Sequence, residues 1–135
     1  MTLSERNRLA ALLLLSLAAS LLHFVHNAEL LSAYPNLPAW LTRSQVYFAW
    51  VGVAAIGVCG LVLYLRGCHS WGLLLIGLYA AFGFDGLLHY SRAPFAEHTV
   101  AMNFTIWFEV VVAAVLLVTV VFAAVKRLHS HGIDA

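Results

Sequence analysis

Four long apolar runs constrain the fold of this chain more than any other feature. They cover about residues 9–32, 45–65, 71–90 and 100–125. Each run approaches or exceeds the ~20 residues that an α-helix needs to cross the hydrocarbon core of a bilayer. Pro and Gly residues lie in the connectors, where the helices have to end. The sequence therefore predicts an all-α integral membrane protein, a four-transmembrane-helix bundle in which residues 1–135 form a single membrane domain.

Composition supports the same class. Of the 135 residues, 63% are hydrophobic and only 10% are charged, whereas a soluble domain has about 25% charged residues. The formal net charge of +1 excludes the basic surface that nucleic-acid binding requires. Cys59 and Cys68 lie nine residues apart, which is neither a zinc-ligand spacing nor a disulfide framework. We therefore expect the lipid bilayer, rather than a nucleic acid, to be the main partner.

The basic residues predict an orientation. With four spans, the two termini and the middle connector share one side of the membrane. That side carries five of the seven basic residues, namely Arg6, Arg8, Arg66, Lys126 and Arg127, and the other connectors carry Arg43 and Arg92. The positive-inside rule then predicts a bundle with both termini cytoplasmic, N-in and C-in. In a bacterial inner membrane, loops 33–44 and 91–99 would face the periplasm.

Polar residues of the spans gather in the half opposite the termini. They are His23, His26, Asn27 and Glu29 in the first run, Asp85 and His89 in the third, and His98, Asn103, Thr105, Trp107 and Glu109 in the fourth. Their spacing is helical: the stripes are Ser16–Ser20–His23–Asn27, Asp85–His89 and His98–Met102–Thr105–Glu109. Polar stripes on membrane helices face the bundle interior rather than lipid. The second run offers small residues instead, so we expect it to act as a closely packed scaffold.

The leading functional hypothesis is a divalent metal site, with catalytic use of the metal on a hydrophobic or periplasmic substrate. Imidazole and carboxylate together suit Zn, Fe or Mn better than Cu, which prefers thiolate and thioether ligands as Cu(I). The predicted ligands are His26, His89, Asp85 and Glu109, with His23, His98 and Glu29 as alternates. Glu109 is the most informative of them, because a carboxylate near the bilayer centre costs about 2.5–3.5 kcal/mol and has to be compensated.

Three alternatives stay open. In a metal-free enzyme of the isomerase or cyclase type, Glu109 and Asp85 would supply acid–base catalysis, and Asn103 and Trp107 would bind a lipid-like substrate. In a b-type haem protein, His26 or His23 would face His89 across the haem, which leaves the carboxylates without a purpose. In a structural or accessory membrane subunit, the same polar groups would hydrogen-bond helix to helix. The sequence decides neither among these, nor on enzymatic activity, nor on oligomeric state.

Overall fold

A computed structural model of the chain describes residues 3–132, with side chains from residue 4 to residue 129. All regular secondary structure in this range is helical. The elements, in chain order, are α1 (Leu3–Glu29), η1 (Leu31–Ala33), α2 (Arg43–Leu65), α3 (His69–Phe82), η2 (Asp85–Leu88), α4 (His89–Arg92), η3 (Phe95–Glu97) and α5 (Val100–Gly132).

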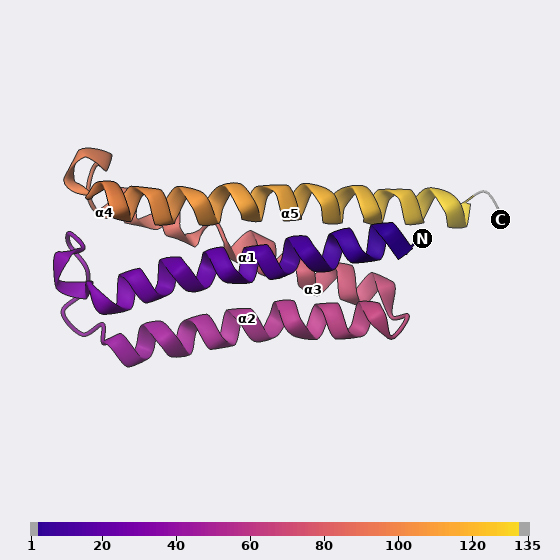
Figure 1. Ribbon diagram of the computed structural model, residues 1–135, viewed down its shortest axis with the longest axis horizontal. Coiled ribbons are helices and arrows are strands. Elements are labelled where there is room, and N and C mark those ends of the chain that lie inside the picture. Colours follow the sequence, from indigo (N-terminus) through magenta and orange to yellow (C-terminus); the bar gives the residue numbers. More distant parts are fainter. Residues whose placement is uncertain (1–2, 133–135) are drawn as a thin grey trace.

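The long helices run side by side along the long axis of the molecule (Figure 1). The start of α1, the end of α5 and the α2–α3 turn lie at one end of the bundle, which we call the terminal end. The α1–α2 connection and the segment from α4 to α5 lie at the opposite end, which we call the loop end. The half of the spans that the sequence analysis placed opposite the termini corresponds to the loop end.

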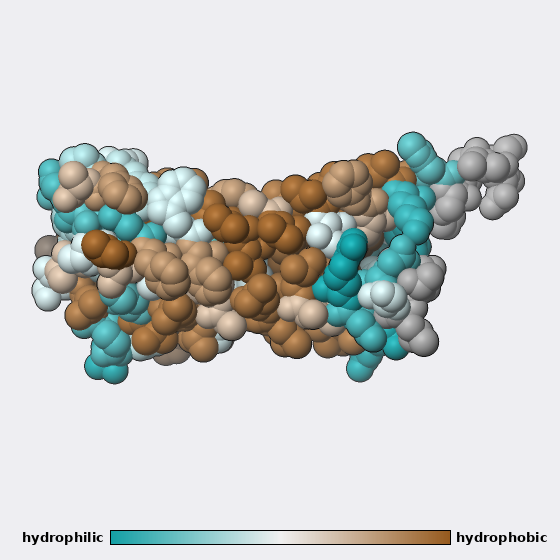
Figure 2. Space-filling view, turned by 45° about the horizontal axis from the view of Figure 1, so that its top comes forward, coloured by the Kyte–Doolittle hydropathy of each residue, from teal (hydrophilic) through white to brown (hydrophobic). Residues whose placement is uncertain are grey.

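Within the described residues, four helical segments are long and apolar enough to cross a membrane: Ser4–Glu29, Arg43–Leu65, His69–Arg92 and Val100–His129. This confirms the predicted all-helical class and the four apolar runs. Hydrophobic residues cover the middle of the visible face, and hydrophilic residues gather at the two ends (Figure 2). Large apolar side chains such as Phe48 and Phe122 are more than two-thirds exposed. Such a surface fits association with a lipid bilayer.

The third span departs from the single helix predicted over residues 71–90. The α-helix ends at Phe82, and the chain continues through a short turn into η2 and α4. Two glycines lie at the break: a side chain would be crowded at Gly83, whereas one at Gly86 would make only ordinary contacts. A Cβ at Gly83 would lie 2.4 Å from Ala113 Cβ, and one at Gly86 would lie 3.5 Å from Ile106 Cγ2. The break brings the backbone of the third span against α5.

The apolar core lies in the terminal half of the bundle. Its fully buried members include Leu13, Ile76 and Leu116, contributed by α1, α3 and α5. The scaffold role predicted for α2 agrees with its glycine contacts on α3. A Cβ at Gly57 would lie 2.8 Å from the Tyr79 ring, and a Cβ at Gly60 would lie 2.9 Å from the backbone nitrogen of Ile76.

Candidate functional site

Three buried imidazole rings form a row at the loop end. The ring centroid of His89 lies 5.5 Å from that of His23 and 6.2 Å from that of His98. We call these three residues the histidine row. Each comes from a different part of the chain: His23 lies in α1, His89 begins α4, and His98 directly follows η3. All three are less than a tenth exposed, so the row lies inside the bundle.

The ring nitrogens of the row are only partly satisfied. His98 Nδ1 lies 3.1 Å from the carbonyl oxygen of Pro94 and donates to it, because a carbonyl oxygen can only accept. His89 Nε2 lies 3.1 Å from the Asn27 side-chain amide. Three of the other four ring nitrogens, His23 Nδ1, His89 Nδ1 and His98 Nε2, are buried and have no hydrogen-bond partner among the described residues. A buried polar atom left unpaired costs about 1–3 kcal/mol, and such atoms often mark a water, an ion or a catalytic group.

Tyr34 belongs to the site although the sequence analysis did not include it. Its side chain is 3% exposed, its hydroxyl lies 2.9 Å from His26 Nδ1, and its ring centroid lies 4.8 Å from that of His89. Burial raises the pKa of Tyr34 to about 12, against a smaller opposing effect of Thr105, so the hydroxyl stays protonated. A tyrosine in a membrane loop usually indicates an interfacial anchor, and no other sequence signal distinguishes this one.

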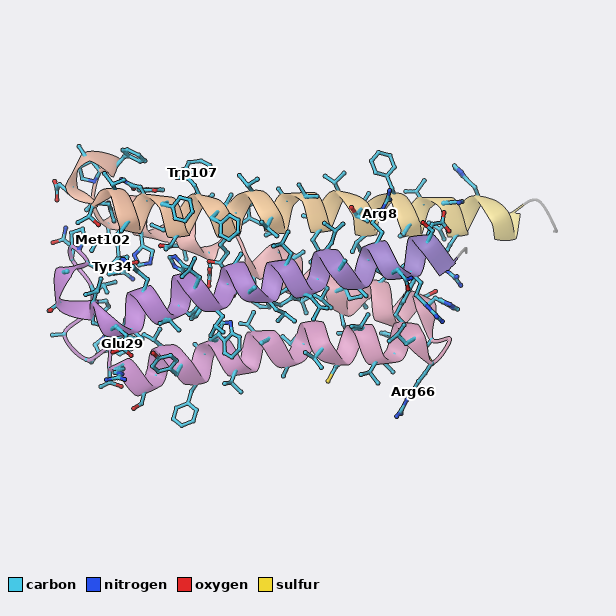
Figure 3. All side chains as sticks on the ribbon, in the orientation of Figure 1. Arg8, Glu29, Tyr34, Arg66, Met102 and Trp107 are labelled. Atoms are coloured by element: carbon cyan, nitrogen blue, oxygen red, sulfur yellow. The ribbon has the colours of Figure 1, made fainter. Side chains whose placement is uncertain are left out.

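The two loops close over the row. The Asn36 side-chain amide donates a 2.8 Å hydrogen bond to the carbonyl oxygen of Arg92, which joins the α1–α2 connection to the end of α4. Figure 3 shows Tyr34 and Met102 between α1 and α5 at this end of the bundle. Met102 is 1% exposed. The row is therefore covered by protein on the loop side.

Two acidic residues form a second part of the site. Glu109 is 2% exposed, and Asp85 lies close enough for its charge to act on the Glu109 carboxyl. We call these two residues the carboxyl pair. Ser20 on α1 also interacts with Glu109, whereas Glu109 Oε2 and the Tyr79 hydroxyl are buried without a hydrogen-bond partner in the described part of the chain.

The carboxyl pair and the histidine row approach each other at His23. A Cβ added at Gly86 would lie 3.7 Å from His23 Cε1 and Nε2, so this ring packs on the backbone of η2. Asp85 is the residue next to Gly86 in that element. The break in the third span thus places the residue that follows Asp85 in the chain against a buried imidazole.

The two predicted substrate-binding residues lie beside the row. Asn103 donates to the carbonyl oxygens of Phe95 (3.3 Å) and His98 (3.2 Å). Its side-chain oxygen accepts a 2.8 Å hydrogen bond from the Tyr90 hydroxyl. Trp107 is 46% exposed and stacks on Tyr90 with a centroid distance of 6.4 Å. In the structure, Asn103 fixes the loop that carries His98, and Trp107 packs on the ring of Tyr90, which is hydrogen-bonded to Asn103.

Glu29, an alternate metal ligand in the sequence analysis, has side-chain partners on α2 rather than in the row. Its carboxylate accepts a 2.6 Å hydrogen bond from the Tyr47 hydroxyl and lies 2.8 Å from Arg43 Nη2. Both partners belong to α2. Glu29 therefore connects the ends of α1 and α2 at the surface of the bundle.

The predicted ligands are thus distributed over several positions. His26 contacts Tyr34. His89 forms the row together with the alternate ligands His23 and His98. Asp85 acts on Glu109. Within the part of the chain that the structure describes, no three His, Cys, Asp or Glu side chains are arranged to hold a metal ion as they stand. The arrangement is a row of adjacent donors rather than an assembled three-ligand centre.

Comparison with known proteins adds no family to this description. No family model matches the chain, and no curated protein or solved structure is significantly similar to it. The function therefore has to be argued from the site itself.

Proposed function

We propose that the protein is a small integral membrane protein that binds one divalent transition-metal ion with the histidine row. The observation that carries the proposal is the unpartnered ring nitrogen on each of three neighbouring, buried imidazoles. A metal ion is small enough to enter such a row without a large cavity. It would bind the nitrogen lone pairs that otherwise have no hydrogen-bond partner.

The spacing of the rings supports this reading. Imidazole nitrogens bind Zn at about 2.0–2.1 Å, so the centroids of two rings on one ion lie roughly 5–6.5 Å apart. The two centroid distances in the row, 5.5 and 6.2 Å, fall in this range. The rings still have to turn for their free nitrogens to converge, which is consistent with the absence of an assembled three-ligand group in the described residues.

One hydrogen bond of the row is of the kind that metal-binding histidines make. A ligating imidazole usually donates its other N–H to a carbonyl, carboxylate or water. His98 makes such a bond to Pro94. For His89, the Asn27 amide has to turn so that Oδ1, which is buried without a partner, accepts from Nε2–H. That turn leaves His89 Nδ1 free to bind the ion.

Zn, Fe and Mn remain the favoured metals, because imidazole and a nearby carboxylate suit them. Asp85 is the acidic residue next to the backbone on which His23 packs, so it is the proposed source of a carboxylate ligand. Open coordination positions on such an ion would bind water or substrate. Catalytic use of the metal is the second step of the proposal and depends on the first.

Elemental analysis and an absorption spectrum of the purified protein test the proposal. We expect one Zn, Fe or Mn per chain and no Soret band. His89→Asn removes the central ring and should abolish stoichiometric metal. His69→Asn is the matched control, because His69 begins α3 at the terminal end. A Soret band would establish haem b instead, and metal retained by His89→Asn would refute the ligand assignment.

A metal-free acid–base site is the second candidate, and the carboxyl pair favours it. Two carboxylates whose charges act on each other in an apolar setting repel each other, so one of them is favoured to hold a proton. Glu109 Oε2 has no partner in the described residues and is free to exchange that proton with a lipid-like substrate. A carbodiimide that modifies protonated carboxyl groups should then label Glu109 in metal-free protein. Exposed Glu97 is the internal control, and equal labelling of both would argue against this candidate.

A further inference from the structure

An apolar groove runs between α3 and α5 in the terminal half of the bundle, far from the histidine row. It has a volume of about 720 Å³. Its walls include Leu73, Leu74 and Gly77 from α3, and Leu117 and Val121 from α5. Gly77 contributes no side chain to its wall, which leaves the space open between the two helices.

One end of the groove is polar and basic. Ser70 and Arg127 line the same groove as the apolar residues, and both lie near the terminal end. That end also carries the basic residues Arg6, Arg8, Arg66 and Lys126, with Glu5 as the acidic residue among the described side chains. A surplus of positive charge at one end of an apolar groove complements an anionic head group.

The length of the groove along α5 matches the thickness of one leaflet of a bilayer. From Leu117 to Arg127 the chain advances roughly 15 Å along α5, at about 1.5 Å per residue. This is half of the ~30 Å hydrocarbon core. The first turn of α3 lies at the polar end, where its N–H groups favour a phosphate.

We propose that this groove binds one anionic phospholipid. One of its acyl chains lies between α3 and α5, and its phosphate lies at Ser70 and Arg127. The lipid occupies the terminal half of the bundle, so this site does not depend on metal binding at the loop end.

Native mass spectrometry of the purified full-length protein tests the proposal, with phosphatidylglycerol and phosphatidylcholine as probes. We expect one phosphatidylglycerol bound per chain and weaker retention of phosphatidylcholine. Arg127→Gln should weaken phosphatidylglycerol binding about fivefold, as expected for one basic residue at an anionic lipid. Arg66→Gln is the matched control: Arg66 is exposed at the same end (Figure 3) but does not line the groove.

A second pair of variants tests the position of the acyl chain. Gly77→Leu fills the groove, and its Cβ meets Val120 Cγ1 at 3.3 Å; we expect loss of both lipids. Gly52→Leu is the control, because a Cβ there meets nothing within 4 Å. If Gly77→Leu does not fold, Val121→Phe fills the groove from a half-exposed position.

Three results would overturn the proposal. Equal retention of the two lipids would remove the preference for an anionic head group. Equal loss in the control and test variants would place the bound lipid elsewhere. A dimer that disappears in Gly77→Leu would assign the groove to a second copy of the chain.

Discussion

Replacing Glu109 distinguishes a functional carboxyl group from one that holds the bundle together. The side chain is 2% exposed, and its Oε2 atom has no hydrogen-bond partner in the described residues. If this polar atom serves function, it costs the fold about 1–3 kcal/mol. Glu109→Met removes that cost and fills the space with an unbranched, adaptable side chain.

The expected change in stability follows from these contacts. Loss of the interaction with Ser20 offsets about 0.5–1.5 kcal/mol of the gain. The variant should therefore range from about 0.5 kcal/mol less stable to about 2.5 kcal/mol more stable than the parent protein. If Glu109 instead locks the bundle through a buried ion pair, its removal should cost about 3–5 kcal/mol.

Equilibrium unfolding by dodecyl sulfate in mixed micelles, followed by circular dichroism, measures the difference. Metal-free protein is used so that ion binding does not add to stability. Glu97→Met is the control: Glu97 is exposed on η3, and a surface change of this kind alters stability by no more than about 0.5 kcal/mol. A loss of several kcal/mol in Glu109→Met alone would refute the functional reading of this carboxyl group.

Three further predictions concern the outer hydrogen bonds, the helix packing and pH. Asn27→Leu removes the amide beside His89 Nε2 and should weaken metal binding about 10–100-fold in a competition titration. Asn7 is exposed on the same helix, so Asn7→Leu should leave metal binding unchanged. Gly60→Ala places a Cβ 2.9 Å from a backbone nitrogen and should destabilise the bundle by about 1–3 kcal/mol in the unfolding assay, whereas Gly52→Ala, with open space around it, should gain up to ~1 kcal/mol of helix propensity. The pKa of Tyr34 is raised to about 12 in the folded protein, above the ~10 of an unfolded chain. The contribution of Tyr34 to stability is therefore complete below pH 10 and is lost as pH rises toward 12. A Tyr34→Phe variant that loses as much stability as the parent over about pH 10–12 would contradict this assignment.

The sequence predicts the spans well because each is decided by average hydropathy. The polar stripes are equally legible: Ser16, Ser20 and His23 are each no more than 3% exposed, and Thr105 and Glu109 are also buried. Helical spacing alone requires members of such a stripe to share one face. Which face that is follows from the cost of exposing polar groups to lipid.

The break in the third span and the role of Tyr34 could not be predicted in the same way. The segment around Gly83 is apolar enough to be read as continuous helix, and only the 2.4 Å approach to Ala113 shows why a turn is preferred there. Tyr34 is recruited by the fold of a loop, which depends on contacts such as that between Asn36 and Arg92. Both features depend on residues far apart in the sequence, and local pattern carries no information about them.

The two halves of the bundle divide stability and chemistry between them. In the terminal half, Leu13, Ile76 and Leu116 are completely buried, and Gly72 packs so closely that a Cβ would lie 2.7 Å from Tyr64 Cα. Close packing of small residues is the main source of helix association in lipid. The loop half holds unpaired polar atoms that oppose folding. A bundle stabilised at one end tolerates that cost at the other, so variants that remove unpaired polar atoms at the loop end should stabilise the protein. Variants that enlarge closely packed glycines in the terminal half should destabilise it.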